Sequence, residues 1–380
     1  MNFTASIALF LSLVSVAWAT TNRFPESNWG TSRYGTFTSV SGFFLQSDSS
    51  TNATSFDFND NLGLKPNYTW NSFKNAIEEL NANSNETTSY KVIFFGRHGE
   101  GYHNVAESYY GTPAWNCYWS LLTGNGTSTW GPDAGLTPKG VFQAQNNSDL
   151  IKSLLPYGFP LPQNFYSSPM TRAADTLTYT WNDIALKTGF VSPIFKESLR
   201  ETIGLHRCDE RRSKTYLKER YPDFQFENGF VEDDLLWTKD TQEPDGAKVL
   251  RLTSFLNDLW ASDPSTYVSV TAHSGVGSAL LSAVGHRSFS LSTGAIIPIV
   301  VRRDSILGFV PPSNATTVSV GTSATAPSCT VSIGSLASSK TASLYSQFSK
   351  DYYQTESYSV LTVTSISTTT ATVTAAISTN

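Results

Sequence analysis

An apolar segment that runs directly into an Arg-His-Gly turn limits most strongly what this chain can fold into. Residues 90–95 are almost all β-branched or aromatic, a composition typical of a buried strand, and the glycines that follow mark a turn. Side chains at such a strand end lie in the crevice above an open α/β sheet, where ligands bind. Arg97 and His98 stand at this position, so the pattern predicts a ligand site around them.

The chemistry of these two side chains favours a phosphoryl group as the ligand. Arg97 carries a permanent planar cation that can bind two phosphate oxygens at once, and the neighbouring imidazole of His98 can act as a nucleophile. Taken alone, the tripeptide also fits an ordinary turn with a buried, hydrogen-bonded histidine. The motifs that accompany it decide between these two interpretations.

Four further motifs follow in order along the chain. They are Asp-Ala-Gly-Leu-Thr-Pro-Lys-Gly at 133–140, Tyr-Ser-Ser-Pro-Met-Thr-Arg-Ala-Ala-Asp-Thr at 166–176, Glu-Ser-Leu-Arg-Glu at 197–201 and Val-Ser-Val-Thr-Ala-His-Ser-Gly at 268–275. With these motifs the sequence resembles the histidine phosphatase superfamily, also called the phosphoglycerate mutase-like family, and in particular its branch of fungal phosphomutase-like proteins and acid phosphatases. The resemblance covers residues 90–309, and residues 43–81 resemble the N-terminal extension of that branch.

The resemblance implies roles for five side chains. His98 corresponds to the histidine that becomes phosphohistidine in the family, and Arg97 and Arg172 would bind the equatorial oxygens of the transferring group. His273 corresponds to the second histidine of the phosphate pocket, and Asn104 stands where the family often has a phosphate-contacting asparagine. The two arginines should lower the pKa of His98, which favours its neutral, attacking form.

Glu201 is the expected general acid, because a leaving alkoxide needs a proton and this glutamate follows a predicted strand as the family's acid does. Three nearby carboxyl groups stay open as alternatives: Glu197, Asp209 and Glu210. The segment 202–212 departs from the mutase pattern. Its candidate substrate contacts fit a charged surface loop at least as well: His206, Cys208 and Arg211.

The net charge of −5 and the pI near 5.6 leave no polybasic face, so nucleic acid and anionic membrane surfaces are not expected partners. An anionic substrate must then be held by local positive charge. Arg97 and Arg172 supply part of it, and a further group of arginines follows: Arg200, Arg207, Arg211 and Arg212. We expect a small phosphorylated substrate as the partner, and the oligomeric state stays open.

Strands and helices alternate along most of the chain. Strands are predicted at 90–95, 163–167, 194–199, 267–272 and 295–301, and helices at 70–81, 138–155, 171–186, 247–261 and 275–284. The aromatic, glycine-rich stretch 105–133 has no clear period and is predicted to be an inserted loop region, with a packing role or a lid role. The alternation favours an α/β fold: a three-layer α/β/α sandwich with a mostly parallel central sheet, phosphoglycerate mutase-like.

The N-terminus predicts entry into the secretory route. Residues 7–16 are apolar and precede Ala17-Trp18-Ala19, which is typical of a signal peptide with its cleavage site. Six further positions carry the Asn-x-Ser/Thr glycosylation pattern: Asn52, Asn67, Asn85, Asn125, Asn146 and Asn314. We expect a secreted glycoprotein, extracellular or in the cell wall, without a membrane span.

Composition, together with the family resemblance, divides the chain into four parts. They are a signal peptide at 1–19, an N-terminal extension packed on the catalytic domain at 20–89, a histidine phosphatase-like catalytic domain at 90–312 and a Ser/Thr-rich tail at 313–380. Serine and threonine make up close to half of the tail, which is typical of an O-glycosylated stalk or a poorly ordered segment.

The cysteines and histidines do not form a metal pattern. Cys117, Cys208 and Cys329 allow one disulfide and one free thiol in an oxidising compartment, and the sequence leaves the pairing open. His103 lies five residues after His98, which is not the spacing of a metal pair on one helix face. No metal and no cofactor are therefore expected.

These observations favour a secreted, metal-independent phosphatase that hydrolyses phosphomonoesters through a covalent phosphohistidine on His98. One alternative is a phosphomutase or a pathway enzyme that acts on a phosphorylated metabolite. An alternative of another class is a non-catalytic cell-surface glycoprotein that keeps the fold and uses the Ser/Thr tail as a stalk. A scaffold has no need for Arg97, His98, Arg172 and His273 together, which disfavours the last alternative.

Overall fold

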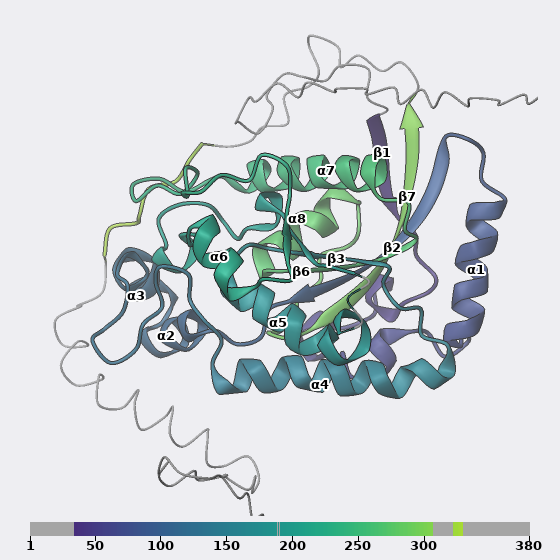
Figure 1. The fold of residues 1–380 in the computed structure, drawn as a ribbon, viewed down its shortest axis with the longest axis horizontal. Coiled ribbons are helices and arrows are strands. Elements are labelled where there is room, and N and C mark those ends of the chain that lie inside the picture. Colours follow the sequence, from purple (N-terminus) through teal and green to yellow (C-terminus); the bar gives the residue numbers. More distant parts are fainter. Residues whose placement is uncertain (1–33, 188, 190, 307–321, 330–380) are drawn as a thin grey trace, which may run out of the picture.

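A seven-stranded sheet with the strand order β1-β7-β2-β6-β3-β4-β5 forms the centre of the molecule (Figure 1). The computed structural model describes residues 34–187, 189, 191–306 and 322–329, so the expected signal peptide, the Asn314 sequon and most of the tail lie outside the described residues. The strands are β1 (Tyr34–Ser39), β2 (Thr88–Arg97), β3 (Asn164–Ser167), β4 (Ile194–Phe195), β5 (Gln225–Phe226), β6 (Tyr267–Ala272) and β7 (Ile296–Ile306). In sheet order, β2, β6, β3, β4 and β5 run parallel to one another, whereas β7 runs antiparallel to both of its neighbours, β2 and β1.

Helices cover both faces of this sheet, which confirms the predicted α/β class (Figure 1). The helices are α1 (Trp70–Ala82), α2 (Tyr102–Tyr110), α3 (Thr112–Cys117), α4 (Pro138–Leu154), α5 (Thr171–Trp181), α6 (Lys214–Arg220), α7 (Asp245–Ser262) and α8 (Ser274–Ala283). Val92 and Phe94 of β2 pack with α1, α4 and α5, and Ile93 and Phe95 pack with α7 and α8. This alternation follows from the two-residue period of a strand and buries β2 on both faces.

The N-terminal part of the described chain is packed into the same core. Trp70, Phe73 and Ile77 lie on one buried face of α1, as their spacing predicts, and Phe44 makes ring contacts with the first two. Strand β1, which the sequence did not predict, pairs with β7 at the edge of the sheet.

Two secondary-structure predictions were wrong. The predicted strand at 194–199 stops after Phe195, because Glu197–Leu199 form a 3-10 turn, η7. The stretch 105–133 is not a plain loop region: most of α2 and all of α3 fall within it. Their aromatic residues form a separate cluster around the fully buried Trp130, so the helices do not show the one-sided pattern of a helix packed on a sheet.

One disulfide joins Cys117 at the end of α3 to Cys329, and Cys208 is free and buried. The structure thereby answers the pairing question that the sequence left open. Residue Ala324 also pairs with Gln242 through backbone hydrogen bonds in both directions. The described segment 322–329 is therefore attached to the rest of the described chain at two points.

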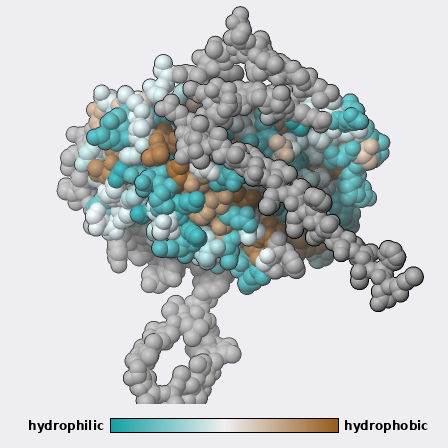
Figure 2. Space-filling model, turned by 45° about the horizontal axis from the view of Figure 1, so that its top comes forward, coloured by the Kyte–Doolittle hydropathy of each residue, from teal (hydrophilic) through white to brown (hydrophobic). Residues whose placement is uncertain are grey.

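Hydrophilic residues cover much of the described surface on the face shown in Figure 2, and hydrophobic side chains gather there in smaller groups. None of the described helices combines the length and the hydrophobicity that a bilayer crossing needs.

Candidate active site

The ends of two neighbouring parallel strands bring His98 and His273 together. Arg97, the last residue of β2, stands opposite Ala272, the last residue of β6. The next residue of each strand is a histidine, so the register alone places the two imidazoles side by side. Their ring centroids are 5.0 Å apart and both side chains are buried.

The surroundings of His98 fix both its tautomer and its charge. Nδ1 lies 2.7 Å from the carbonyl oxygen of Gly99, and a carbonyl only accepts, so Nδ1 carries the proton of the neutral ring and Nε2 keeps its lone pair. Burial, followed by the charges of Arg172 and Arg97, holds the pKa of His98 well below its usual range. The ring is therefore neutral and presents a free nitrogen nucleophile.

Two glycines let the loop after β2 and the start of α4 approach each other. A Cβ on Gly99 would collide with the backbone of Gly140, and a Cβ on Gly140 would collide with the backbone of Glu100. Thr137 caps α4 by accepting from the Gly140 amide at 3.1 Å and also donates to Glu100. The Leu-Thr-Pro-Lys-Gly part of the second motif thus positions the histidine loop.

His273 is held by the strand on its other side. Its Nε2 lies 2.7 Å from the hydroxyl of Ser168, which follows β3, and its Nδ1 is buried without a partner among the described residues. Burial, and then the charge of Arg172, holds its pKa well below the usual histidine range. His273 is thus a second neutral imidazole with one unused nitrogen.

Arg172 is fully buried in the first turn of α5. Its Nη2 donates to Asp209 at 2.6 Å and its Nη1 donates to the carbonyl of Cys208 at 2.8 Å. Asp133 lies 3.8 Å from Nη1 and accepts from the Thr171 amide, so it also caps α5. Burial raises the pKa of Asp133 to about 6 although Arg172 opposes the shift.

Arg97 reaches the same region from the end of β2. Its Nη1 donates to the carbonyl of Leu291 at 2.6 Å, and its Nε is buried without a partner among the described residues. Burial lowers the pKa of Arg97, and the carboxylates of Glu201 and Glu107 oppose that effect. The two arginines and Glu201 are therefore close enough to interact electrostatically.

Glu201 lies at the N-terminus of α8, directly beside the His273 loop. Its Oε2 accepts from the amide of Gly275 at 3.0 Å and its Oε1 accepts from the amide of Thr202 at 3.0 Å. A Cβ at position 275 would collide with the Glu201 carboxyl group, so the glycine of the last motif makes room for it.

The three alternative carboxyl groups are each used in an ion pair. Glu197 pairs with Arg211 at 2.7 Å, Asp209 pairs with Arg172, and Glu210 pairs with Arg207. Within the described residues, Glu201 is the one member of this group that makes no ion pair. This arrangement favours Glu201 among the four candidate acids.

His103 is a residue that sequence reasoning missed. Its ring centroid lies 5.3 Å from that of His98, and its Nδ1 is buried without a partner among the described residues. Burial, and then the charge of Arg172, holds the pKa of His103 well below the usual range. The sequence analysis did not predict that α2 begins immediately after Gly101. This helix start turns the side chain at position 103 back toward the end of β2.

Asn104 has a structural task at the start of the same helix. Its Oδ1 accepts from the amide of Gly101 at 2.9 Å, which caps α2. The amide nitrogen of its side chain is not needed for this cap and can still donate to a ligand.

Two of the predicted arginines are paired with carboxylates of the protein. Arg200 is buried and donates to Asp234 at 2.7 Å, and Arg211 is buried and pairs with Glu197 while donating to backbone carbonyl groups. Both therefore hold the loop after β4 together. Arg207 pairs with Glu210 and lies over Trp237, and Arg212 lies over Tyr216.

The comparisons with known proteins agree with this geometry. A model of the histidine phosphatase superfamily (branch 1) matches residues 93–294. The chain belongs to the histidine phosphatase superfamily.

Relatives of this superfamily member are found among fungal proteins. It is 38% identical over 283 residues to a protein of Arthroderma benhamiae named "Probable phosphoglycerate mutase", with 70% of this chain and 84% of the other covered. It is 39% identical over 266 residues to "Phosphomutase-like protein 3" of Candida albicans, with 70% and 79% covered. Among solved structures, the alpha-ribazole phosphatase of Shigella flexneri is 18% identical and covers 55% of this chain and 89% of its own, with a TM-score of 0.34.

Proposed function

We propose that this histidine phosphatase is a secreted enzyme that hydrolyses phosphomonoesters through a covalent phosphohistidine. The observation that carries the proposal is the pairing of two neutral, buried imidazoles at 5.0 Å, with the proton of His98 fixed on Nδ1 by the Gly99 carbonyl. A neutral nitrogen with a free lone pair is what attack on phosphorus requires.

In the first step, Nε2 of His98 attacks phosphorus and the bond from phosphorus to the ester oxygen breaks. Glu201, in its acid form, gives its proton to the leaving oxygen, so an alcohol departs. In the second step, water attacks the phosphohistidine, Glu201 takes a proton from that water, and the bond from nitrogen to phosphorus breaks to release inorganic phosphate.

Positive and donor groups around His98 would hold the phosphoryl oxygens during both steps. Arg97 and Arg172 each have a buried Nε without a partner among the described residues, and His273 has an unused Nδ1. Asn104 can donate from its side-chain amide nitrogen. Fixed donors of this kind stabilise the charge that the transferring group carries.

A trapped intermediate tests the nucleophile. With a ³²P-labelled monoester and rapid acid-free quenching, we expect a label on the protein that is stable to base and lost in acid, and absent in His98→Ala. The half-buried His286 provides a matched control, because His286→Ala should label normally. Normal labelling of His98→Ala would contradict the assignment.

The phosphoryl acceptor separates a phosphatase from a mutase, a second candidate that the names of the fungal relatives favour. In ¹⁸O-labelled water we expect one labelled oxygen in each phosphate released, even with phosphoglycerate or sugar acceptors present. If most phosphoryl groups were instead found on such an acceptor, without ¹⁸O from water, the enzyme would be a mutase.

Secretion is supported by the apolar segment before Ala17-Trp18-Ala19 and by the sequons. Four of the five described sequon asparagines are exposed: Asn52, Asn67, Asn85 and Asn146. Expression of the full chain in a eukaryotic secretory host should give protein in the medium that begins at Thr20 and loses mass with an N-glycosidase. Retention of the unprocessed chain in the cytosol would contradict this part of the proposal.

A further inference from the structure

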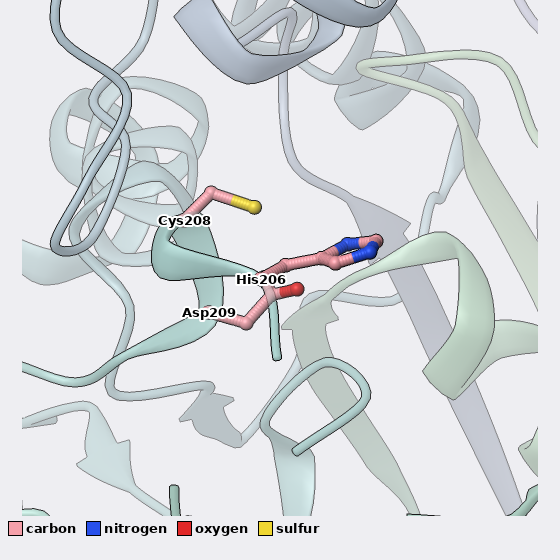
Figure 3. A group of neighbouring side chains, drawn as sticks. All are labelled: His206, Cys208 and Asp209. Carbon is pink, nitrogen blue, oxygen red and sulfur yellow. The ribbon is translucent and has the colours of Figure 1, made fainter. Parts of the chain in front are cut away.

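A group of three different metal-ligand side chains lies beside Arg172. His206 directly precedes the 3-10 turn η8 (Arg207–Asp209), which carries Cys208 and Asp209 (Figure 3). One donor atom of each side chain lies within 4.8 Å of the donor atoms of the other two. Nitrogen, sulfur and oxygen donors from these three residue types are the ligands that zinc takes in proteins.

We propose that His206, Cys208 and Asp209 bind a divalent metal ion of the zinc type, and that the bound ion strengthens the binding of a tetrahedral oxyanion at Arg172. The second half of this proposal rests on the proposed role of Arg172. The ion is not a cofactor of the hydrolysis described above, whose steps use side chains only.

The state of the three side chains favours coordination. His206 is half-buried, so its ring can reach the two buried ligands from the side of solvent. Cys208 and Asp209 are buried next to each other. A bound ion would replace the thiol proton, which leaves to solvent, and three protein ligands would leave a fourth position for water.

The local charge also favours a cation at this place. A Cys208 thiolate and the Asp209 carboxylate together cancel the charge of a divalent ion, and the Glu201 carboxylate acts on both residues from nearby. Arg172 opposes the ion, but it already shares its charge with Asp209 and, more distantly, with Asp133. The site can therefore hold an ion without a net excess of positive charge.

Asp209 links the two sites. Its Oδ1 accepts from Nη2 of Arg172 at 2.6 Å, so without a metal this carboxylate competes with an oxyanion for the guanidinium group. Coordination to the ion neutralises Asp209 and leaves Nη2 of Arg172 to the oxyanion, while the ion adds positive charge nearby. Both effects act in the same direction, and linkage requires the oxyanion to strengthen metal binding by the same factor.

Metal binding is measured on the full-length, chelator-treated protein, without any assay of hydrolysis. We expect zinc to bind one-to-one in calorimetry, and cobalt to give a thiolate-to-metal charge-transfer absorption in the near ultraviolet. Cys208→Ser should abolish that absorption, and Cys208→Ser and His206→Gln should each weaken binding by about tenfold or more. His286→Gln, which changes a histidine outside the cluster, should bind as the wild type does.

Absence of the cobalt absorption in the wild-type protein would overturn the metal site, even if a variant fails to fold. Unchanged zinc binding in a folded Cys208→Ser protein would overturn it as well. A protein that binds metal in this way but hydrolyses no monoester contradicts only the proposed function, whereas an active phosphatase that binds no metal contradicts only this inference.

The link to Arg172 is tested with sulfate, a tetrahedral dianion that keeps zinc and cobalt in solution. We expect saturating zinc to tighten sulfate binding by about fivefold or more. Asp209→Asn should bind sulfate more tightly than the wild type in the absence of metal, and zinc should then have little further effect. Equal sulfate affinity with and without bound zinc would refute the link and leave the metal site in place.

Discussion

The strand ends and the loop after β4 contribute to the same site by different means. His98 and His273 follow β2 and β6, and the backbone register of two parallel strands sets their distance. Residues 197–212 have almost no regular structure, and buried ion pairs hold them: Arg200 with Asp234, Arg211 with Glu197, and Arg172 with Asp209. A rigid sheet thus positions the proposed nucleophile, and a charge network positions the proposed acid.

This difference determines how substitutions in the two regions should act. Side chains at strand ends keep their places as long as the core packs, because main-chain hydrogen bonds fix the register. A loop held by buried charges loses its shape when one partner is removed, since the other charge is left uncompensated in the interior. Changes in the loop should therefore alter stability and acid catalysis together, whereas changes at the strand ends should alter chemistry alone.

The largest expected effect separates the nucleophile from the acid. His98→Ala should lower activity on every monoester by ~10³-fold or more, because it removes the proposed nucleophile. Glu201→Gln should lower kcat/KM for alkyl phosphates by about 10²- to 10⁴-fold but change kcat/KM for 4-nitrophenyl phosphate far less, since that leaving group needs no proton. Steady-state kcat/KM reports the first step alone, so an equal loss of kcat/KM on both substrates would remove Glu201 as the acid.

The next largest effect is on the stability of the loop. Arg200→Met should reduce the free energy of unfolding by about 3–5 kcal/mol, because Asp234 stays buried without its cation. Arg302→Met on β7 is the matched control: Arg302 forms an exposed pair with Asp304, and its loss should cost far less stability, because solvent screens the pair. Denaturant unfolding measures both variants. Similar losses of unfolding free energy in the two would show that the buried pairs do not hold the loop more strongly than an exposed pair holds a strand.

A smaller effect concerns pH and the cap of α5. The pKa of Asp133 is about 6 in the folded protein against 3.8 for an ordinary aspartate, so between these values the folded state holds a proton that the unfolded state has released. Stability from this group is present below pH 4 and is lost as pH rises through 6, by up to ~3 kcal/mol.

Asp133→Asn should remove this dependence. The difference in unfolding free energy between wild type and variant should change between pH 4 and pH 6 in favour of the variant. Asp149→Asn, at an exposed carboxylate of α4, should follow the wild-type curve. Parallel curves for wild type and Asp133→Asn would show that the buried aspartate does not hold the extra proton.

The smallest expected effect tests the third imidazole. His103→Asn removes a ring 5.3 Å from that of His98 and should lower kcat/KM by about tenfold, the loss of one hydrogen bond to a charged group. Thermal unfolding should change little, because Nδ1 of His103 has no partner among the described residues to lose. A variant with full activity would leave His103 as a packing residue only.

The elements that pack on the central strands were the part of the fold that the sequence predicted best. The segment 267–272 forms β6 with the predicted bounds, and Thr137-Pro138 marks the start of α4. The stretch around Trp115 and Trp130 was not predicted, because these residues pack mainly on one another and show no helical period. The periodicity of apolar residues predicts an element that packs on the sheet. It does not predict α2 and α3, which pack on their own aromatic cluster.

The site followed the same division. His98, His273 and Arg172 could be predicted because each directly follows a strand or opens a helix next to one. His103 could not, since its place depends on where α2 begins, and the partners of Arg200 and Arg211 could not, because Asp234 and the carbonyl groups around it come from a segment without a pattern. The pairing of Cys117 with Cys329 depends on the whole fold.

That pairing also constrains how the molecule is made. The two cysteines are 212 positions apart, so the covalent link can close only after the ribosome has produced the chain as far as Cys329. A protease that later cuts any exposed site between them would leave both pieces joined in one molecule, separable on a gel only after reduction.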